Sequence, residues 1–336
     1  CFSDLAKKSG KGRTAWYDDA LDAVRRHQLM IENGIRQGLE QDEFEVWYQP
    51  VVDADTLAMT GVEALLRWPR RPQGALAPDA FIAIAESSGL IDALGQFVLQ
   101  RACSDLQPVD DLLLSVNISP AQFRDPAFEN RVMKTVAACR FPPSRLQVEV
   151  TESYVLENPE RSQAVVENLK AQGIAVALDD FGTGYSSIGY LRRFRFDSLK
   201  IDKSLAGRVD SDEQAAEMVR GTVRIARALG MTVVAEGVED PQQLTLLRRA
   251  ATGFRGTISV NRCRSPICCS GVSRRGDYSP ASASSLSRKP VTEMARLSAR
   301  QRSCGPGAEL CTAITCQPSS VFNSSGDPLS PGSVSH

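Results

Sequence analysis

The stretch AVALDDFGTGYSS, residues 175–187, decides the fold. Small and apolar residues run directly into two adjacent carboxylates, Asp179 and Asp180, and a turn rich in Gly and Ser follows. An apolar run bounded by turn residues is typical of a buried parallel strand. The carboxylates then lie at its carboxyl end, where parallel sheets and barrels bind ligands. Because adjacent buried carboxylates repel each other, we expect a cation there, most simply a divalent metal ion.

Outward from this strand, strand patterns alternate with helical patterns. We expect strands at 43–50, 60–68, 111–118, 145–152, 174–180, 197–202 and 231–236. We expect helices at 19–40, 77–87, 90–106, 125–139, 159–172, 212–229 and 241–250. Repeated β–α units over roughly 200–250 residues predict a TIM-like (β/α) barrel rather than two small domains. The pattern stops after Ala250, so the eighth strand is expected to be missing.

Composition divides the chain into an acidic body and a basic tail, although the net charge is only −1. Residues 251–336 are rich in Ser, Arg, Pro and Cys without periodicity, which predicts a disordered tail. The acidic body argues against binding to nucleic-acid polymers. No apolar run is long enough to span a membrane and no signal peptide opens the chain. We therefore expect a cytoplasmic domain, although upstream segments could anchor the parent protein.

Polar residues recur along the predicted strands, mostly near their carboxyl ends. They are Glu63, Arg67, Asn117, Glu149, Glu152, Asp179, Asp180, Lys200 and Glu236. Each alone is better explained by a turn, a cap or a surface charge, but independent surface residues would not all fall on one rim. Several carboxylates with an amide suit Mg²⁺ or Mn²⁺, and so many acids suggest two ions. Lys200 could orient an attacking water, and Arg67 could hold a phosphate.

Six motifs resemble, in order, those of the EAL-domain family of cyclic di-GMP phosphodiesterases. They are EALLRW at 63–68, VNISPAQF at 116–123, VEVTES at 148–153, LDDFGTGYSS at 178–187, LKIDKS at 199–204 and AEGVE at 235–239. The resemblance covers about residues 36–249. It implies a TIM-like barrel and a Mg²⁺- or Mn²⁺-dependent hydrolysis of one phosphodiester of cyclic di-GMP, giving linear pGpG.

The resemblance also implies a role for each matching residue. One metal ion would be held by Glu63, Asn117, Glu149 and Asp179, and a second by Asp179, Asp180 and Glu236. The catalytic residues would be Lys200, which holds the attacking water, with Asp180 and Glu236. The substrate would contact Gln49, Arg67 and Glu239. Thr151 and Glu152 would brace the loop at 181–187, which links the site to homodimer formation in this family.

The two ends of the chain suggest a tandem protein with a disrupted gene. Residues 1–18, with DLAKKSGKGR at 4–13, resemble the end of a GGDEF (diguanylate cyclase) domain without its signature loop. We therefore expect a helical linker at 19–41, an EAL barrel at 42–250 and a tail at 251–336, in a parent with upstream GGDEF and sensory domains. Shifting the reading frame near Ala250 can spell GDGLQGYHLSQPLPVA, which resembles the family's eighth-strand segment. We hypothesise a frameshift there, natural or from sequencing error.

Three functional interpretations follow from these observations. The first is a cyclic di-GMP phosphodiesterase, impaired by the loss of the eighth strand and the unpaired edges that this loss would leave. The second is a module that binds cyclic di-GMP without cutting it. The third is an inactive product of a disrupted gene. The enzyme is favoured because every expected metal ligand before residue 250 is present.

Overall fold

The computed structural model describes residues 19–152, 158–182, 188–238, 241–250 and 256–259. Its strands are β1 (Glu45–Asp53), β2 (Met59–Arg67), β3 (Leu113–Asn117), β4 (Leu146–Thr151), β5 (Ala175–Phe181), β6 (Ser198–Ile201), β7 (Thr232–Ala235) and β8 (Gly256–Ser259). Its longer helices are α2 (Asp19–Glu40), α3 (Pro78–Ser88), α4 (Ile91–Leu106), α6 (Phe128–Ala138), α8 (Pro159–Ala171), α11 (Glu213–Ala228) and α12 (Pro241–Ala250). Shorter helical segments are α5 (Pro120–Arg124), η1 (Pro143–Arg145), α9 (Ile188–Phe194) and α10 (Lys203–Ala206).

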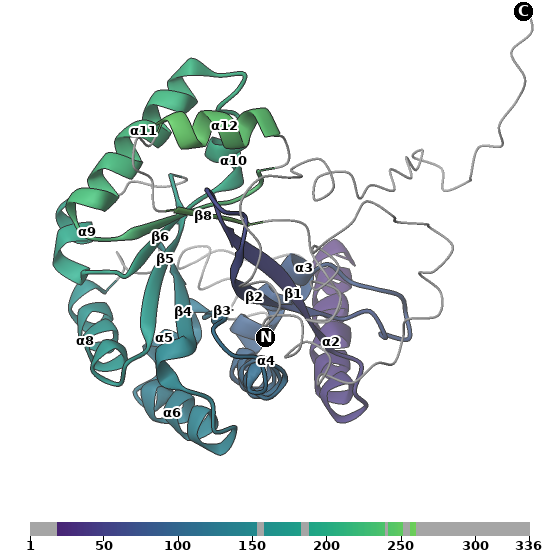
Figure 1. The fold of residues 1–336 in the computed structure, drawn as a ribbon. Helices are drawn as coiled ribbons and strands as arrows, with labels where there is room; N and C mark the ends of the chain where they lie inside the picture. The colour runs from purple at the N-terminus through teal and green to yellow at the C-terminus, as the bar shows by residue number, and fades with distance from the viewer. Residues whose placement is uncertain (1–18, 153–157, 183–187, 239–240, 251–255, 260–336) are drawn as a thin grey trace, which may run out of the picture.

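The eight strands close into a barrel in the order of the sequence. Strands β2 to β8 run parallel to one another, whereas β1 runs antiparallel to both of its neighbours, β2 and β8. The helices surround the barrel (Figure 1). The predicted TIM-like fold and its seven expected strands are therefore confirmed, and the reversed direction of β1 is a feature that the sequence pattern did not reveal.

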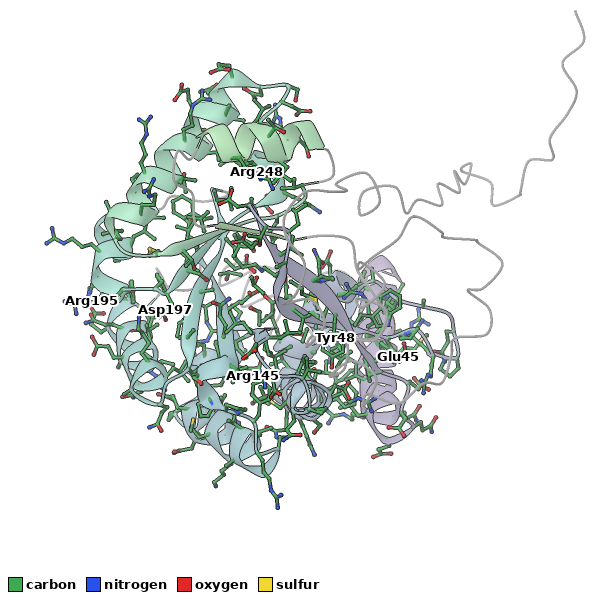
Figure 2. All side chains as sticks on the ribbon, in the orientation of Figure 1. Glu45, Tyr48, Arg145, Arg195, Asp197 and Arg248 are labelled. Atoms are coloured by element: carbon green, nitrogen blue, oxygen red, sulfur yellow. The ribbon has the colours of Figure 1, made fainter. Side chains whose placement is uncertain are left out.

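The eighth strand corrects the expectation that this position is empty. Gly256–Ser259, which the sequence analysis placed in the tail, pair with β7 on one side and with β1 on the other. The edges of β1 and β7 are thus covered rather than unpaired. Nearby, the guanidinium of Arg248 on α12 donates hydrogen bonds to the carbonyl oxygens of Ala54 and Asp55 (Figure 2). Helix α12 is thereby attached to the turn that follows β1.

Most of the predicted tail, residues 251–255 and 260–336, lies outside the described residues.

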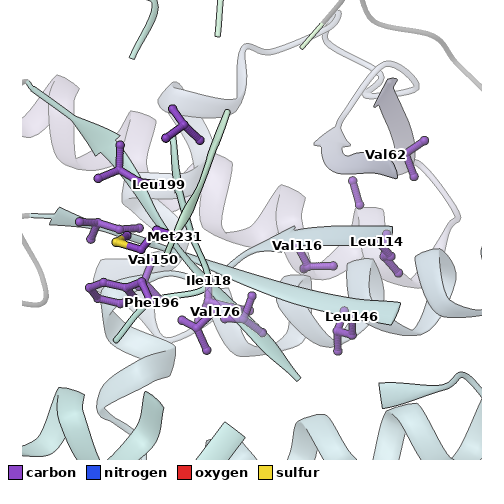
Figure 3. Close-up of a cluster of buried hydrophobic side chains, with 14 of the residues drawn as sticks. Val62, Leu114, Val116, Ile118, Leu146, Val150, Val176, Phe196, Leu199 and Met231 are labelled. Atoms are coloured by element: carbon purple, nitrogen blue, oxygen red, sulfur yellow. The ribbon is translucent and has the colours of Figure 1, made fainter. Parts of the chain in front are cut away.

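Alternating side chains along the strands create two environments. Successive residues of a strand point to opposite faces, and both faces of a barrel sheet are buried. Apolar residues such as Leu114, Val116, Leu146, Val176 and Leu199 belong to one large buried cluster that includes residues of the surrounding helices (Figure 3). The residues between them face the barrel interior. Most of the polar residues singled out by the sequence lie on that inner face.

A second, smaller core attaches helix α2 to the barrel wall. Ile31 and Ile35 pack in a cluster with Phe44, Trp68 and residues of α3 and α4. The close approach of the helix depends on glycine, because a Cβ at Gly38 would lie 3.0 Å from Phe44 and from the Glu43 carboxylate. The expected helix at 19–40 thus packs against the barrel wall. Within the described residues, no helix combines the length and the apolarity that a membrane span requires.

Candidate active site

Lys200 lies at the centre of the candidate site. Its side chain is 3 % exposed, and its Nζ atom lies within ion-pair distance of four carboxylates from four parts of the barrel. The distances are 3.2 Å to Glu63 Oε2, 2.6 Å to Glu149 Oε2, 3.1 Å to Asp179 Oδ2 and 2.8 Å to Glu236 Oε1. We refer to these five residues as the acid cluster. The predicted convergence on one rim is thus observed, with the lysine inside the ring of acids.

Strand register explains why these side chains meet. Glu149 on β4 is the register partner of Ala177 on β5, and Ala177 is the partner of Ser198 on β6. Asp179 comes two residues after Ala177, and Lys200 comes two residues after Ser198. Both side chains therefore lie on the same face as Glu149. Glu236 comes directly after β7, and its backbone N–H donates to the carbonyl of Ile201 on β6. Parallel pairing therefore brings residues distant in the sequence to one level of the barrel.

The acid cluster carries more negative than positive charge. Burial raises the pKa of Glu149 to about 8, and the nearby Glu63 and Asp179 add to this effect while Lys200 opposes it. Burial and the charge of Asp179 also raise the pKa of Glu236. Burial disfavours the ammonium of Lys200, yet the surrounding carboxylates raise the pKa of this lysine well above its ordinary value. Such perturbed groups gathered in one place are typical of a functional site.

Asn117 and Asp180 extend the acid cluster at its edges. The Nδ2 atom of Asn117 donates to Glu63 Oε1 at 2.6 Å, so both oxygens of that carboxylate have partners. The backbone N–H of Asp180 donates to Asp179 Oδ1 at 2.8 Å. Asp180 has a φ of 56°, at a register irregularity between Leu178 and Phe181. Asp adopts this left-handed conformation more readily than most residues, which allows the strand to end with both carboxylates near the same opening. Burial and Asp179 raise the pKa of Asp180.

The donor set fits a hard divalent cation. Carboxylates and one amide are the oxygen ligands that Mg²⁺ and Mn²⁺ prefer, and the excess negative charge of the acid cluster favours a cation. Among the described residues, no three His, Cys, Asp or Glu side chains are grouped so as to hold a metal ion, and the Lys200 ammonium lies between the acids. The chemistry of the site thus agrees with the expected ions, while their coordination stays a prediction.

Strand register and local contacts place three more of the predicted residues. Gln49 on β1 is the register partner of Glu63. Arg67 lies at the end of β2, where its guanidinium donates to the carbonyl of Leu66 and stacks over Trp47. Thr151 is the register partner of Asp179.

Two predicted features of the loop region are less completely described. Glu152 is buried, and within the described part of the chain neither of its carboxylate oxygens has a hydrogen-bond partner. Glu239 and residues 183–187 of the predicted bracing loop lie outside the described residues.

The sequence analysis missed a polar layer directly below the acid cluster. Ser115, Gln147 and Ser198 are buried, and Gln147 is hydrogen-bonded to both serines. A signal for them exists in the sequence, because each lies two residues before a predicted site residue. The three predicted site residues that follow them are Asn117, Glu149 and Lys200, respectively.

Comparison with known proteins places this architecture among proteins of cyclic di-GMP signalling. The family model described as "EAL domain" matches residues 32–254. An uncharacterised signalling protein of Caulobacter vibrioides is 39% identical over 72% of this chain and 30% of its own length. The bifunctional diguanylate cyclase/cyclic di-GMP phosphodiesterase MucR of Pseudomonas aeruginosa is 36% identical over 75% of this chain and 38% of its own length.

Structural similarity agrees with these matches. The solved structure titled PaMucR phosphodiesterase, c-di-GMP complex, superimposes with a TM-score of 0.65 at 36% identity, and the match covers 68% of this chain and 94% of that one. The chain spans only about a third of the length of the two curated relatives described above.

Proposed function

Because this chain belongs to the EAL domain family, we propose that it is a phosphodiesterase that hydrolyses one phosphodiester of cyclic di-GMP to give linear pGpG. The observation that carries the proposal is the acid cluster, in which four carboxylates surround the buried ammonium of Lys200. Phosphoester hydrolysis needs cations to balance charge on the attacking and leaving oxygens, and this site provides acids to bind such cations.

In this proposal, the acids hold two Mg²⁺ or Mn²⁺ ions. Glu63, Asn117, Glu149 and Asp179 would bind one ion, and Asp179, Asp180 and Glu236 would bind the other. When bound, such ions stabilise negative charge on phosphoryl oxygens and favour deprotonation of a water.

The chain's own residues position the reactants. Lys200 donates a hydrogen bond to the attacking water and keeps it in line with the phosphorus, and Glu236, 2.8 Å from the same ammonium, accepts the proton of that water. Burial, together with the charge of Asp179, raises the pKa of Glu236 and so makes its carboxylate a stronger base. Arg67 binds a substrate phosphate, with Gln49 and Glu239 as further contacts to the substrate.

A second candidate is a module that binds cyclic di-GMP without hydrolysing it. The observation in its favour is the central position of Lys200, whose ammonium already occupies the middle of the acid cluster. A third candidate is an inactive product of a frameshifted gene. The short strand β8 closes the barrel with residues that lie beyond the proposed shift, in place of the segment that resembles the family's own.

The deciding experiment incubates the purified chain with cyclic di-GMP and Mn²⁺ or Mg²⁺ and follows pGpG by chromatography. Turnover that disappears on chelation and in Glu63→Ala supports the enzyme. Binding of cyclic di-GMP without any turnover contradicts it and supports the binding module. Aggregation or loss of both properties, with recovery when the alternative reading frame is restored, supports the disrupted gene.

We also propose the cellular setting that the resemblance implies. The domain would act in the cytoplasm as a homodimer, in a parent protein that carries a GGDEF domain upstream. The bifunctional relative MucR, named as both a cyclase and a phosphodiesterase, supports such a tandem. Size-exclusion chromatography with light scattering tests the dimer, and a monomer at working concentrations contradicts it.

A further inference from the structure

The polar layer beneath the acid cluster needs a physical explanation. Ser115, Gln147 and Ser198 are at most 5 % exposed and lie on the inner face of the barrel. Such interior layers of TIM-like barrels are filled mainly by branched apolar side chains. Burying polar groups instead costs free energy unless they are fully hydrogen-bonded, and even then it contributes little to stability. A polar layer at this level therefore suggests a use other than packing.

The amide of Gln147 connects this layer to the acid cluster. Its Nε2 atom donates to Ser115 Oγ at 2.9 Å and, over a longer distance of 3.4 Å, to Glu149 Oε1. Its Oε1 atom accepts from Ser198 Oγ at 3.1 Å. Both N–H groups and the carbonyl oxygen are thus engaged. A flipped amide would turn its oxygen toward the carboxylate, so the two serines and Glu149 together specify one orientation.

Glu149 is consequently held from two sides. Gln147 contacts Oε1 from below, and Lys200 contacts Oε2 at 2.6 Å. We propose that Gln147 is a positioning residue that, itself held by Ser115 and Ser198, fixes the carboxylate of Glu149 in the orientation needed to bind a divalent cation. This inference rests on the proposed function, because it assigns a partner to one of its metal ligands. Such outer partners orient ligands and so reduce the freedom lost when an ion binds.

The chemistry of an amide suits this task. A cationic side chain at position 147 would neutralise Glu149 and compete with the metal ion. A carboxylate there would add a further negative charge next to an acid cluster whose negative charge already exceeds its positive charge. An apolar side chain would fill the space but leave Glu149 Oε1 without the donor below it. A neutral donor orients the carboxylate and leaves its charge available.

The test compares Gln147→Leu with the wild-type chain. The first measurement is binding of Mn²⁺ alone, from the electron paramagnetic resonance signal of the free ion, and the second is kcat and KM for cyclic di-GMP. Thr135→Val is the matched control, because it removes a buried hydroxyl that bonds Gln96 and the Arg131 carbonyl on the outer helices. Thermal unfolding is recorded for every variant.

We expect Gln147→Leu to weaken Mn²⁺ binding by about tenfold and to lower kcat similarly, with KM for cyclic di-GMP changed less than twofold. Thr135→Val should lower thermal stability while leaving Mn²⁺ affinity unchanged. A folded Gln147→Leu protein with wild-type Mn²⁺ affinity and kcat overturns the proposal. If this variant does not fold, Ser198→Ala takes its place. The Mn²⁺ affinity of Ser198→Ala must then be lower than that of the wild type. The affinity must be restored in Ser198→Thr, which keeps the hydroxyl.

The same measurements separate this inference from the proposed function. Wild-type protein that binds Mn²⁺ but never produces pGpG contradicts the phosphodiesterase, while the Mn²⁺ affinities of the variants still decide the role of Gln147. Wild-type protein that binds no Mn²⁺ overturns both.

Discussion

Two glutamates of this domain, Glu43 and Glu63, are almost equally buried, at 7 % and 6 % exposed, yet their surroundings differ completely. Glu43 accepts a hydrogen bond from the indole Nε1 of Trp68 at 2.8 Å, at the edge of the aromatic core beneath α2. Glu63 shares the Lys200 ammonium with three further acids and accepts a hydrogen bond from Asn117. The two acids lie on opposite sides of the barrel wall.

Burial of an acid therefore does not by itself mark a functional site. Glu43 meets a neutral donor among apolar rings, which is an arrangement that stabilises one packing of α2. Glu63 lies among like charges that one lysine cannot balance, which is costly for folding and useful for binding a cation. The excess of charge, rather than the buried carboxylate, is the signature of the site. Four predictions test this distinction.

The largest effect is expected from Lys200→Met. Removal of the ammonium that contacts all four acids should lower turnover of cyclic di-GMP by about a thousandfold, because the variant loses a donor that positions the water and stabilises charge. Initial rates of pGpG formation measure this effect. Lys170→Met is the matched control, because Lys170 pairs with Asp197 outside the acid cluster. Residual activity above a tenth of the wild-type rate would contradict the central role of Lys200.

The next effect separates the two glutamates directly. Glu63→Gln should lower turnover by about a hundredfold, since it removes a charged metal ligand and neutralises one of four crowded acids. Its free energy of unfolding should stay level or rise, because like-charge repulsion falls. Glu43→Gln should keep turnover within about twofold of wild type. Equal losses of activity in the two variants would mean that burial, and not the surrounding charge, determines function.

A smaller effect, on stability alone, is expected from Trp68→Phe. The variant keeps an aromatic ring against Phe44 and Phe81 but removes the N–H that satisfies Glu43. We expect a loss of about 1–3 kcal/mol in the free energy of unfolding, the cost of leaving a buried acceptor unsatisfied. Urea unfolding measures it, and a double-mutant cycle with Glu43→Gln shows whether the two residues are coupled. No coupling would contradict the hydrogen bond as the source of the effect.

The smallest effect is expected on the exposed face of α2. Glu32 and Arg36 form an ion pair one helical turn apart at 2.8 Å, with the Arg36 side chain 53 % exposed. Because such pairs are screened by water, Glu32→Ala should change the free energy of unfolding by about 0.5 kcal/mol or less. The same urea unfolding measures this effect. A change above about 1 kcal/mol would contradict the expectation that this exposed ion pair contributes little to the free energy of unfolding.

The sequence predicts the strands and the acids because both depend on local patterns. An apolar run followed by Asp179 and Asp180 is visible without knowledge of any neighbour, and β5 has nearly the expected bounds. The central position of Lys200 was not predictable in this way, because it depends on which strands face each other across a closed barrel. The antiparallel direction of β1 likewise depends on pairing at long range.

Two further misses have different causes. Strand β8 has four residues, too few to give a periodic signal within an irregular region, so its residues were assigned to the tail. The place of Gln147 on the inner face was open to prediction, because an amide two residues before Glu149 must share its face of β4. It was overlooked because a single polar residue in an apolar run resembles ordinary variation, and only its contacts with Ser115 and Ser198 give it meaning.

The pairing of β1 with β8 has a consequence for how the domain is made. Val51 meets Ser259 and Asp53 meets Thr257, so the first strand of the barrel is completed by the last one to be synthesised. Contacts between such distant residues slow folding, since the entropy of closing a long loop is lost before any contact compensates for it. During translation the outer edge of β1 stays exposed until the ribosome has released β8, and exposed strand edges promote aggregation. The hypothesised change of reading frame near residue 250 would therefore act at the step that completes folding, even though every residue of the acid cluster precedes it.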